Sequence, residues 1–217
     1  MAVESLARVD SPRTHEQLSR IVAEGIDSDS RRQAVESLGR RADPEVDREL
    51  LDIARTHGIA DVRRQAVESL GRRAGSGIDD MLMQIAKENE SLDARRQAVE
   101  SLGRRDGDRI DERLMEVTRW NAPADVQRQA VESLGRRGGS RARGLLVGLA
   151  RDHRSRDVQR QAVESLGRLE ADVMPDLEEI ARSHPSGEIR RQAVESMTRR
   201  DPERALAILE KILQKSE

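Results

Sequence analysis

The chain has 217 residues and no cysteine, which excludes a disulfide framework and a cysteine-based zinc site. Charged residues make up 37% of it, yet the net charge is −2, which argues against a strongly basic nucleic-acid binder. It contains no run of 18 apolar residues, and its start lacks the basic and apolar parts of a signal peptide. We therefore expect a soluble segment without membrane contact, and a cytoplasmic location is favoured.

An internal repeat dominates the sequence. The string Gln-Ala-Val-Glu-Ser recurs at steps of 32, 32, 32, 32 and 31 residues, and a partial copy, Ala2–Leu6, opens the chain. Such a period is typical of stacked two-helix repeats. The six full copies begin at Gln33, Gln65, Gln97, Gln129, Gln161 and Gln192.

Each period contains two helical patterns, named here helix A and helix B. In the second full repeat, apolar residues recur at helical spacing over residues 46–54, and His57-Gly58 is expected to end this helix A, with glycine as a natural C-terminal stop. Asp61 is predicted to cap a helix B over residues 62–73. One face of that helix is apolar and the opposite face is charged. The apolar face is formed by Val62, Ala66, Val67 and Leu70.

The same layout follows down the chain. Each helix A keeps a leucine for the core, at Leu18, Leu50, Leu82, Leu114, Leu146 and Leu177. Each helix B is predicted to be capped by an acidic residue, at Asp29, Asp61, Asp93, Asp125, Asp157 and Glu188. Glycines near the end of helix B are expected to permit close helix approach, at Gly39, Gly71, Gly103, Gly135 and Gly167.

The repeat resembles the HEAT repeat, especially its short bacterial form. The residues that carry the resemblance are Asp61-Val62-Arg63, Ala66 and Leu70-Gly71 with their equivalents, while Gln127 and Gln159 depart from it by replacing the arginine. The resemblance implies an all-α fold, an α–α superhelix of about 14 helices in two-helix repeats of 31–32 residues. It also implies that helix B faces a concave surface and that the array binds proteins.

We expect one array over residues 1–217: a partial repeat over 1–10, six full repeats over about 12–200 and a C-terminal capping helix over 201–217. Because the first copy begins inside a helix B, Met1 is interpreted as a start within a longer protein. Arginine outnumbers lysine 36 to 3, which indicates a bacterial source of high GC content.

The candidate binding surface is a charged stripe on helix B, kept in all six full repeats. It is either a solvated face with ion pairs, retained from recent duplication, or a partner-binding surface. Helix A has diverged between copies and helix B has not, which favours a constraint on helix B. The candidate partner-binding residues are Arg32, Glu36, Arg40, Arg64, Glu68, Arg72, Arg96, Glu100, Arg104, Arg128, Glu132, Arg136, Arg160, Glu164, Arg168, Arg191, Glu195 and Arg199, together with Trp120.

Nucleic-acid binding is an alternative, in which further arginines raise the positive charge of the face: Arg41, Arg73, Arg105 and Arg137. The chain has no aromatic cluster on which nucleic-acid bases could stack.

A second alternative is an enzyme of the HEAT-like lyase or hydroxylase kind. His15-Glu16 is similar to the metal motif of deoxyhypusine hydroxylase, a HEAT-like protein that needs several such pairs. The remaining histidines share one place at the end of helix A, too far apart for one metal ion: His57, His153 and His184.

The sequence therefore predicts a protein-interaction scaffold and not an enzyme, without catalytic, cofactor-binding or metal residues. Its partner is expected to be a protein or peptide. Similar arrays are joined to larger bacterial sensors, including BlaR-type membrane metallopeptidases, so a regulatory accessory domain is expected. The oligomeric state stays open.

Overall fold

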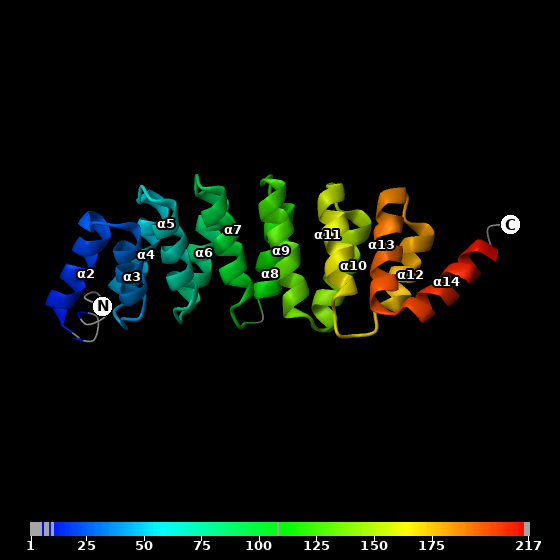
Figure 1. Ribbon diagram of the computed structural model, residues 1–217, viewed down its shortest axis with the longest axis horizontal. Coiled ribbons are helices and arrows are strands. Elements are labelled where there is room, and N and C mark those ends of the chain that lie inside the picture. The colour runs from blue at the N-terminus through cyan, green and yellow to red at the C-terminus, as the bar shows by residue number, and fades with distance from the viewer. Residues whose placement is uncertain (1–5, 7–8, 10, 108, 215–217) are drawn as a thin grey trace. The chain divides into compact units, whose positions relative to one another are not determined.

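The computed structural model describes residues 6, 9, 11–107 and 109–214, and all regular structure in this part of the chain is helical (Figure 1). Seven helices are of type A: α2 (Pro12–Glu24), α4 (Glu45–Thr56), α6 (Ser76–Glu88), α8 (Ile110–Arg119), α10 (Gly139–Asp152), α12 (Met174–Ser183) and α14 (Pro202–Gln214). Six are of type B: α3 (Ser28–Gly39), α5 (Ala60–Gly71), α7 (Leu92–Gly103), α9 (Ala124–Arg137), α11 (Arg156–Gly167) and α13 (Gly187–Arg200).

The all-α, HEAT-like solenoid prediction is confirmed. The partial helix B predicted over residues 1–10 lies almost wholly outside the described residues, which accounts for the difference between thirteen helices and the expected fourteen. Among the helices that are described, none is long and apolar enough to cross a bilayer.

The chain divides into two compact units, Met1–Gly107 and Asp108–Glu217. In the first unit, helices A and B pair as α2/α3, α4/α5 and α6/α7, and α3, α5 and α7 pack in succession. In the second, the pairs are α8/α9, α10/α11 and α12/α13; α9, α11 and α13 pack in succession, and α14 covers α13. The prediction of one array over residues 1–217 stays a prediction.

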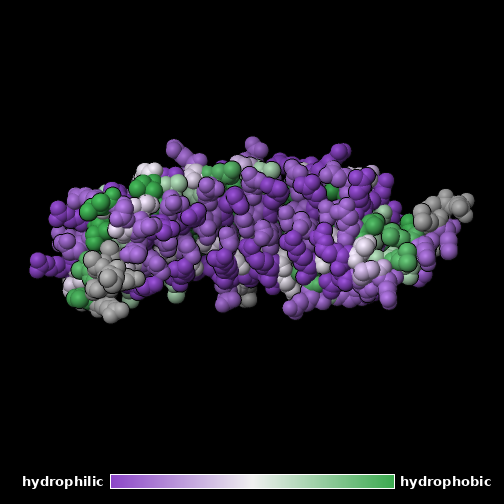
Figure 2. Space-filling model, viewed as in Figure 1, coloured by the Kyte–Doolittle hydropathy of each residue, from purple (hydrophilic) through white to green (hydrophobic). Residues whose placement is uncertain are grey.

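The core is built as the apolar spacing predicts. The six helix A leucines from Leu18 to Leu177 are fully buried, as are Val62, Ala66, Val67 and Leu70 of α5. A two-helix repeat cannot bury this surface alone, so each repeat depends on its neighbours for its core. Hydrophobic side chains also gather on the surface over α14 (Figure 2), where Leu206 is 59% exposed.

Successive B helices approach each other through a glycine and a serine. A Cβ atom added at Gly71 would lie 2.6 Å from Cβ of Ser101, and one added at Gly135 would lie 2.8 Å from Cβ of Ser165. Gly39 and Gly167 make the same contact with Ser69 and Ser196. The predicted close approach is therefore confirmed at these four glycines.

One expectation about the helix ends is wrong. The acidic residues expected to cap helix B occupy its second position instead; α5 begins at Ala60, so Asp61 lies in its first turn. There the carboxylate still favours the positive end of the helix dipole. Helix α4 ends at Thr56, directly before His57-Gly58 as expected, and His57 is the residue whose backbone becomes extended (φ −64°, ψ 133°). The ends of helix A depend on a side chain, as shown below.

Candidate functional site

The predicted charged stripe lies on the helix B face, and its last two residues form an ion pair within one helix turn. The nitrogen–oxygen distances are 2.7 Å for Arg40–Glu36, 2.6 Å for Arg104–Glu100, 2.8 Å for Arg136–Glu132 and 2.5 Å for Arg168–Glu164, and Arg72 pairs with Glu68 in the same way. A glutamate one turn before its cation is the favoured order in a helix. In α13 the equivalent Arg191, Glu195 and Arg199 are all exposed.

The first arginine of the stripe pairs backwards, with the acidic residue of the first turn, and not with the stripe glutamate. The pairs are Arg32–Asp29 at 2.8 Å, Arg64–Asp61 at 3.0 Å, Arg96–Asp93 at 3.9 Å, Arg160–Asp157 at 3.7 Å, and Arg128–Asp125. Each helix B therefore presents four charges of alternating sign, ordered acidic, basic, acidic, basic from its N-terminus. Since both ends suit the helix dipole, this order also stabilises the helix itself.

Pairing between repeats also occurs on this face, as the spacing of the helices allows. Nη1 of Arg72 lies 3.9 Å from Glu36 of the preceding repeat, and Nη1 of Arg160 lies 3.7 Å from Glu188 of the following one. Exposed pairs of this kind contribute about 0–1 kcal/mol each, so the face can exchange partners at little cost.

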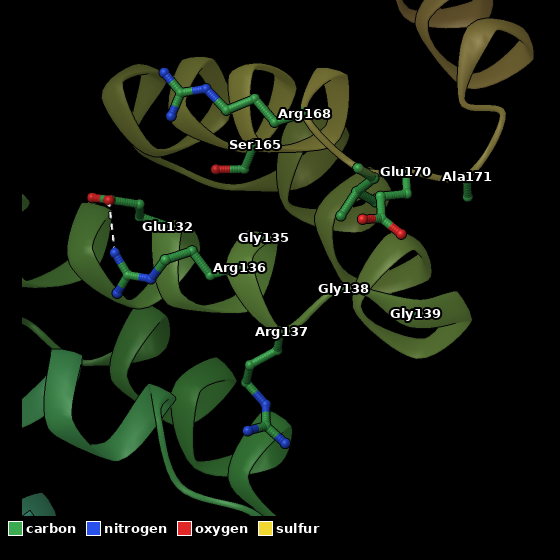
Figure 3. A pocket seen from close by; sticks show the side chains of 11 residues that line it. Glu132, Gly135, Arg136, Arg137, Gly138, Gly139, Ser165, Arg168, Glu170 and Ala171 are labelled. Carbon is green, nitrogen blue, oxygen red and sulfur yellow. Dashed lines mark hydrogen bonds and ion pairs between the residues drawn. The ribbon is translucent and has the colours of Figure 1, made fainter.

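Two grooves lie at equivalent places between the C-terminal halves of neighbouring B helices. The first, of about 680 Å³, lies between α9 and α11; its walls include Arg136 and Arg168, and its floor includes Gly135 and Ser165 (Figure 3). The second, of about 600 Å³, lies between α5 and α7, with Arg72 and Arg104 in its walls and Gly71 and Ser101 in its floor. The glycine–serine contact produces both grooves, because neither residue has a side chain long enough to fill the space.

The second arginine at the end of helix B is not available to a ligand, contrary to the suggestion that it raises the charge of the face. Arg105 is only 13% exposed; its guanidinium pairs with Asp79 and donates to the carbonyls of Gly71 (3.0 Å), Arg73 (2.6 Å) and Gly75 (3.0 Å). It thereby caps the C-terminus of the preceding helix B.

The contact by which an arginine at the end of helix B binds an aspartate and backbone carbonyls of the preceding repeat is called here a tie. It recurs in other repeats. Arg73 pairs with Asp47 and donates to Gly39, Arg41 and Asp43, and Arg137 pairs with Asp111 at 2.5 Å. Arg200, which the sequence reading did not single out, donates to the carbonyls of Gly167 and Leu169. Arg41 donates to the carbonyl of Ser11 at 3.1 Å. Figure 3 shows Arg137 turned away from the groove that Arg136 lines.

The arginine after the first apolar residue of helix B has a different task. Arg63 donates to the carbonyl of His57 at 2.6 Å, and Arg95 donates to that of Ala86 at 2.8 Å, which satisfies the end of helix A in the same repeat. Gln127 does this with the carbonyls of Thr118 (3.1 Å) and Trp120 (2.7 Å), and Gln159 with that of Arg151 (3.2 Å). The two departures from the HEAT motif thus keep the donor and lose only the charge.

Two of the histidines at the end of helix A, His57 and His153, connect repeats, whereas Nε2 of His184 is buried without a hydrogen-bond partner among the described residues. Nε2 of His57 lies 3.1 Å from the carbonyl of Val22 in the preceding repeat, and its Nδ1 accepts the N–H of Ile59 at 3.1 Å. His153 makes the equivalent pair of contacts with Thr118 and Ser155. Asn89 occupies the same place, donating to Ala54 at 2.9 Å and accepting from Ser91. An amide can stand in for imidazole here, so the position is used for hydrogen bonding.

His15, the other histidine weighed as a metal ligand, pairs with Glu49 of α4 at 2.8 Å. Within the part of the chain that the structure describes, three or more His, Cys, Asp or Glu side chains are not grouped to hold a metal ion.

Two carboxyl groups outside the stripe have lowered pKa values. The pKa of Asp27 is lowered mainly by the hydrogen bond it accepts from the backbone N–H of Ser30, at the start of α3. The pKa of Asp172 is lowered mainly by the hydrogen bond from Arg204, at 3.0 Å. Both shifts come from caps and ties between helices, so they mark structural carboxylates.

Trp120, the remaining candidate, is half-buried at the end of α8. Its main-chain carbonyl accepts a hydrogen bond from Arg154 of the next repeat at 2.9 Å. Nearby, a groove of about 470 Å³ runs between α8 and α10 on the helix A side, bounded by Met115, Leu145 and the two exposed glycines Gly144 and Gly148. Sequence reasoning missed this groove, although glycine replaces charged residues of other repeats at both positions.

The comparison with known families agrees with this architecture. HEAT repeats match residues 80–167, 112–183 and 146–217, which together span well over half of the chain. The chain belongs to the HEAT-repeat family. No curated protein sequence matches it.

Among solved structures, this HEAT-repeat chain is similar to YibA of Escherichia coli, with 17% identity over 96% of this chain and 77% of that one, and a TM-score of 0.54. Human deoxyhypusine hydroxylase matches with 18% identity over 99% and 85% of the two chains and a TM-score of 0.42. The CpcE–CpcF complex of phycocyanin lyase from Nostoc sp. PCC7120 matches with 15% identity over 86% and 99%, and a TM-score of 0.36. At these identities the likeness concerns the fold.

The inter-repeat ties could have been found from sequence. An aspartate stands 26 residues before the tying arginine in three successive repeats, as Asp47/Arg73, Asp79/Arg105 and Asp111/Arg137. In the next repeat both positions change together, to Arg143 and Leu169. This joint change is the signal of a contact, and it separates the tying arginines from those of the exposed stripe.

Proposed function

We propose that the chain is a protein-binding scaffold that uses the helix B face, and that it acts without a catalytic step of its own. The observation that carries the proposal is the unchanged stripe glutamate. Packing and ties explain the alanine, leucine, serine and glycine of α5 and the second arginine at its end, whereas Glu68 of the same helix makes only an ion pair on the surface. Such a pair contributes little to stability, so binding is the better reason to keep it.

A role as regulatory accessory domain of a larger bacterial protein, such as a BlaR-type sensor, is part of the same proposal. It follows from the family resemblance, and it needs a partner that the face recognises. Nucleic acid is the weaker alternative because the chain has a net charge of −2 and a single aromatic side chain, Trp120, so it offers neither a basic excess for the phosphates nor an aromatic cluster on which bases could stack.

The test is affinity capture from a lysate of the source organism, quantified by mass spectrometry. One bait is the native chain, and a second carries Glu68→Arg, Glu100→Arg and Glu132→Arg. A matched control carries the same charge changes on exposed helix A positions, as Glu16→Arg, Asp52→Arg and Glu116→Arg. The proposal expects a protein that the native and control baits retain and the helix B variant loses.

The two alternatives give different results. Each Glu→Arg change raises the charge by two units, so a nucleic-acid partner would be held more tightly by both variants. A partner lost equally from both variants, or equal recovery from all three baits, would contradict binding through the helix B face.

A further inference from the structure

In the first five full repeats, the last arginine of the stripe is more exposed than the glutamate with which it pairs. We name these side chains the C-terminal arginine row: Arg40, Arg72, Arg104, Arg136 and Arg168. Arg72 and Arg104 are 56% and 60% exposed, whereas their partners Glu68 and Glu100 are 33% and 27% exposed. At these two positions the glutamate therefore lies beneath the guanidinium and holds it in place, whereas Arg136 and Glu132 of α9 are almost equally exposed, at 43% and 42%. A guanidinium has five N–H donors, so one carboxylate leaves donors directed outward.

Each groove lies between two members of this row. Arg72 and Arg104 stand on either side of the groove between α5 and α7, and Arg136 and Arg168 on either side of the groove between α9 and α11 (Figure 3). A carboxylate in either groove would meet a guanidinium from each of two repeats. Paired N–H donors of this kind form the strong, charge-assisted hydrogen bonds of arginine with carboxylates.

The lining charges leave two guanidinium groups open to a guest in each groove. Arg73, Arg105 and Arg137 also line the grooves but are held by aspartates, so each groove offers two arginines of the row beside two carboxylates. Two of the carboxylates, Glu68 and Glu132, already pair with Arg72 and Arg136. The others, Asp106 and Glu170, are exposed residues beyond the ends of α7 and α11.

The repeat also sets a spacing. Neighbouring packed helices are about 8–10 Å apart, so members of the arginine row within one unit follow each other at about that interval. An extended peptide advances about 3.3 Å per residue, so every third residue returns after about 10 Å. A helix, at about 1.5 Å per residue, would need six or seven residues for the same step.

We propose that the C-terminal arginine row binds an extended acidic segment of a partner protein, with carboxylates at every third residue. Within each unit, a carboxylate lies between two consecutive arginines of the row, such as Arg72 and Arg104 or Arg136 and Arg168, over the glycine–serine floor. The inference rests on the proposed binding function and names the chemistry of its partner.

The test uses synthetic peptides and fluorescence anisotropy with the whole chain. One labelled peptide carries four glutamates, each followed by Gly-Ser; a second has the same composition with the four glutamates contiguous; a third replaces each glutamate of the first by lysine. We expect the spaced acidic peptide to bind about tenfold more tightly than the contiguous one, which is a difference of about 1.4 kcal/mol.

The matched variants separate the row from general charge. Arg72→Gln, Arg104→Gln, Arg136→Gln and Arg168→Gln together are expected to weaken binding of the spaced peptide about tenfold or more. Arg48→Gln, Arg55→Gln, Arg109→Gln and Arg119→Gln remove equal charge from exposed positions of the helix A side and are expected to change it less than about twofold. Circular dichroism melts confirm that both variants are folded.

Equal binding of the two acidic peptides, equal losses in the two variants, or tighter binding of the lysine peptide would each overturn the inference. The capture experiment is separate, because Glu68→Arg, Glu100→Arg and Glu132→Arg remove the carboxylates that hold the row arginines in place. A segment bound between positioned arginines is lost there, whereas an acidic partner bound by charge alone is retained. A partner lost there, with no preference for spaced carboxylates here, would leave the scaffold function standing and reject only the acidic segment.

Discussion

The joint between α5 and α7 and the joint between α9 and α11 join equivalent helices by different means. In the first, Arg105 pairs with Asp79 and donates to three carbonyls at the end of α5 and beyond it. In the second, Leu169 stands in place of the arginine and is buried, and Arg143 stands in place of the aspartate and pairs with Asp176 at 2.6 Å.

The C-terminal end of helix α9 is capped by its own chain segment and not by an arginine tie from the next repeat. It continues to Arg137 and ends on Gly138, whose φ of +67° suits glycine and whose N–H bonds to the carbonyl of Leu134 at 3.2 Å. The comparison teaches that a helix B needs a cap at its C-terminus, which either the next repeat or a local glycine can supply. Only the first solution makes one repeat depend on the next for polar contacts.

The largest expected effect is the loss of the tie. Arg105→Leu copies the α9/α11 joint into the α5/α7 joint, but leaves Asp79 and the carbonyls of Gly71 and Arg73 without their donor. Removing one partner of a buried pair costs about 3 kcal/mol or more, which urea unfolding followed by circular dichroism measures. Arg104→Leu, one residue earlier and exposed, is the control and is expected to cost about 0.5 kcal/mol. Equal losses would show that the tie does not stabilise the joint.

The second-largest effect is expected at the glycine–serine contact, which is common to both joints. At Gly71 a new Cβ atom would lie 2.6 Å from Cβ of Ser101, so Gly71→Ala must push two helices apart and is expected to cost about 1–3 kcal/mol. Gly148→Ala is the opposite case, since nothing lies within 4 Å of its Cβ position in α10. It is expected to raise the free energy of unfolding by about 0.5–1 kcal/mol. A loss at Gly148 would contradict this explanation of the glycines.

A double-mutant cycle tests the reverse change, in which the joint between α9 and α11 is given the arginine–aspartate pair of the joint between α5 and α7. Leu169→Arg alone places a charge at a buried position beside Arg143, whereas Leu169→Arg with Arg143→Asp recreates the tie of the other repeats. We expect a favourable coupling of about 1–2 kcal/mol between the two changes. Trp120 is the only tryptophan and belongs to the same unit, so its fluorescence can report the unfolding. A coupling near zero would mean that the local cap on Gly138 has made the tie redundant.

The smallest effect is expected at His57, the histidine at the end of α4 that binds the preceding repeat. His57→Asn should cost less than about 0.5 kcal/mol, because Asn89 makes the same two contacts in the next repeat. His57→Ala removes both contacts and is expected to cost about 1–2 kcal/mol. Thermal unfolding of the two variants side by side distinguishes them. If alanine were tolerated as well as asparagine, the imidazole would not connect the repeats.

The sequence predicted the helices and the core because both follow from apolar spacing that recurs in every repeat. Leu50 and Ala66 are buried for the reason that their positions imply. It failed where a contact joins different repeats, since the spacing within one helix cannot show which of two adjacent arginines turns inward. Arg72 and Arg73 look alike in sequence, but the helix places one on the exposed face and the other beneath the preceding repeat.

The start of helix B was misplaced for a related reason. Asp61 can act either as a cap or in the first turn, and both uses favour an acidic residue. The sequence also did not reveal that Nδ1 of His57 accepts a hydrogen bond from the N–H of Ile59, just before helix B begins. The structure places the stripe on the outer face of helix B, with most of its arginines exposed and most of its glutamates half-buried, and its role in binding stays a prediction.

The ties have a consequence for how such an array changes its copy number. Arg73 and Arg105 each reach a carbonyl 34 residues earlier and an aspartate 26 residues earlier. Removing or duplicating one whole period of such repeats therefore leaves each remaining arginine with a partner, wherever the genetic breakpoints fall. An insertion of a single residue between the aspartate and its arginine shifts them out of step. Selection on these contacts alone would favour gain and loss of complete repeats over small insertions.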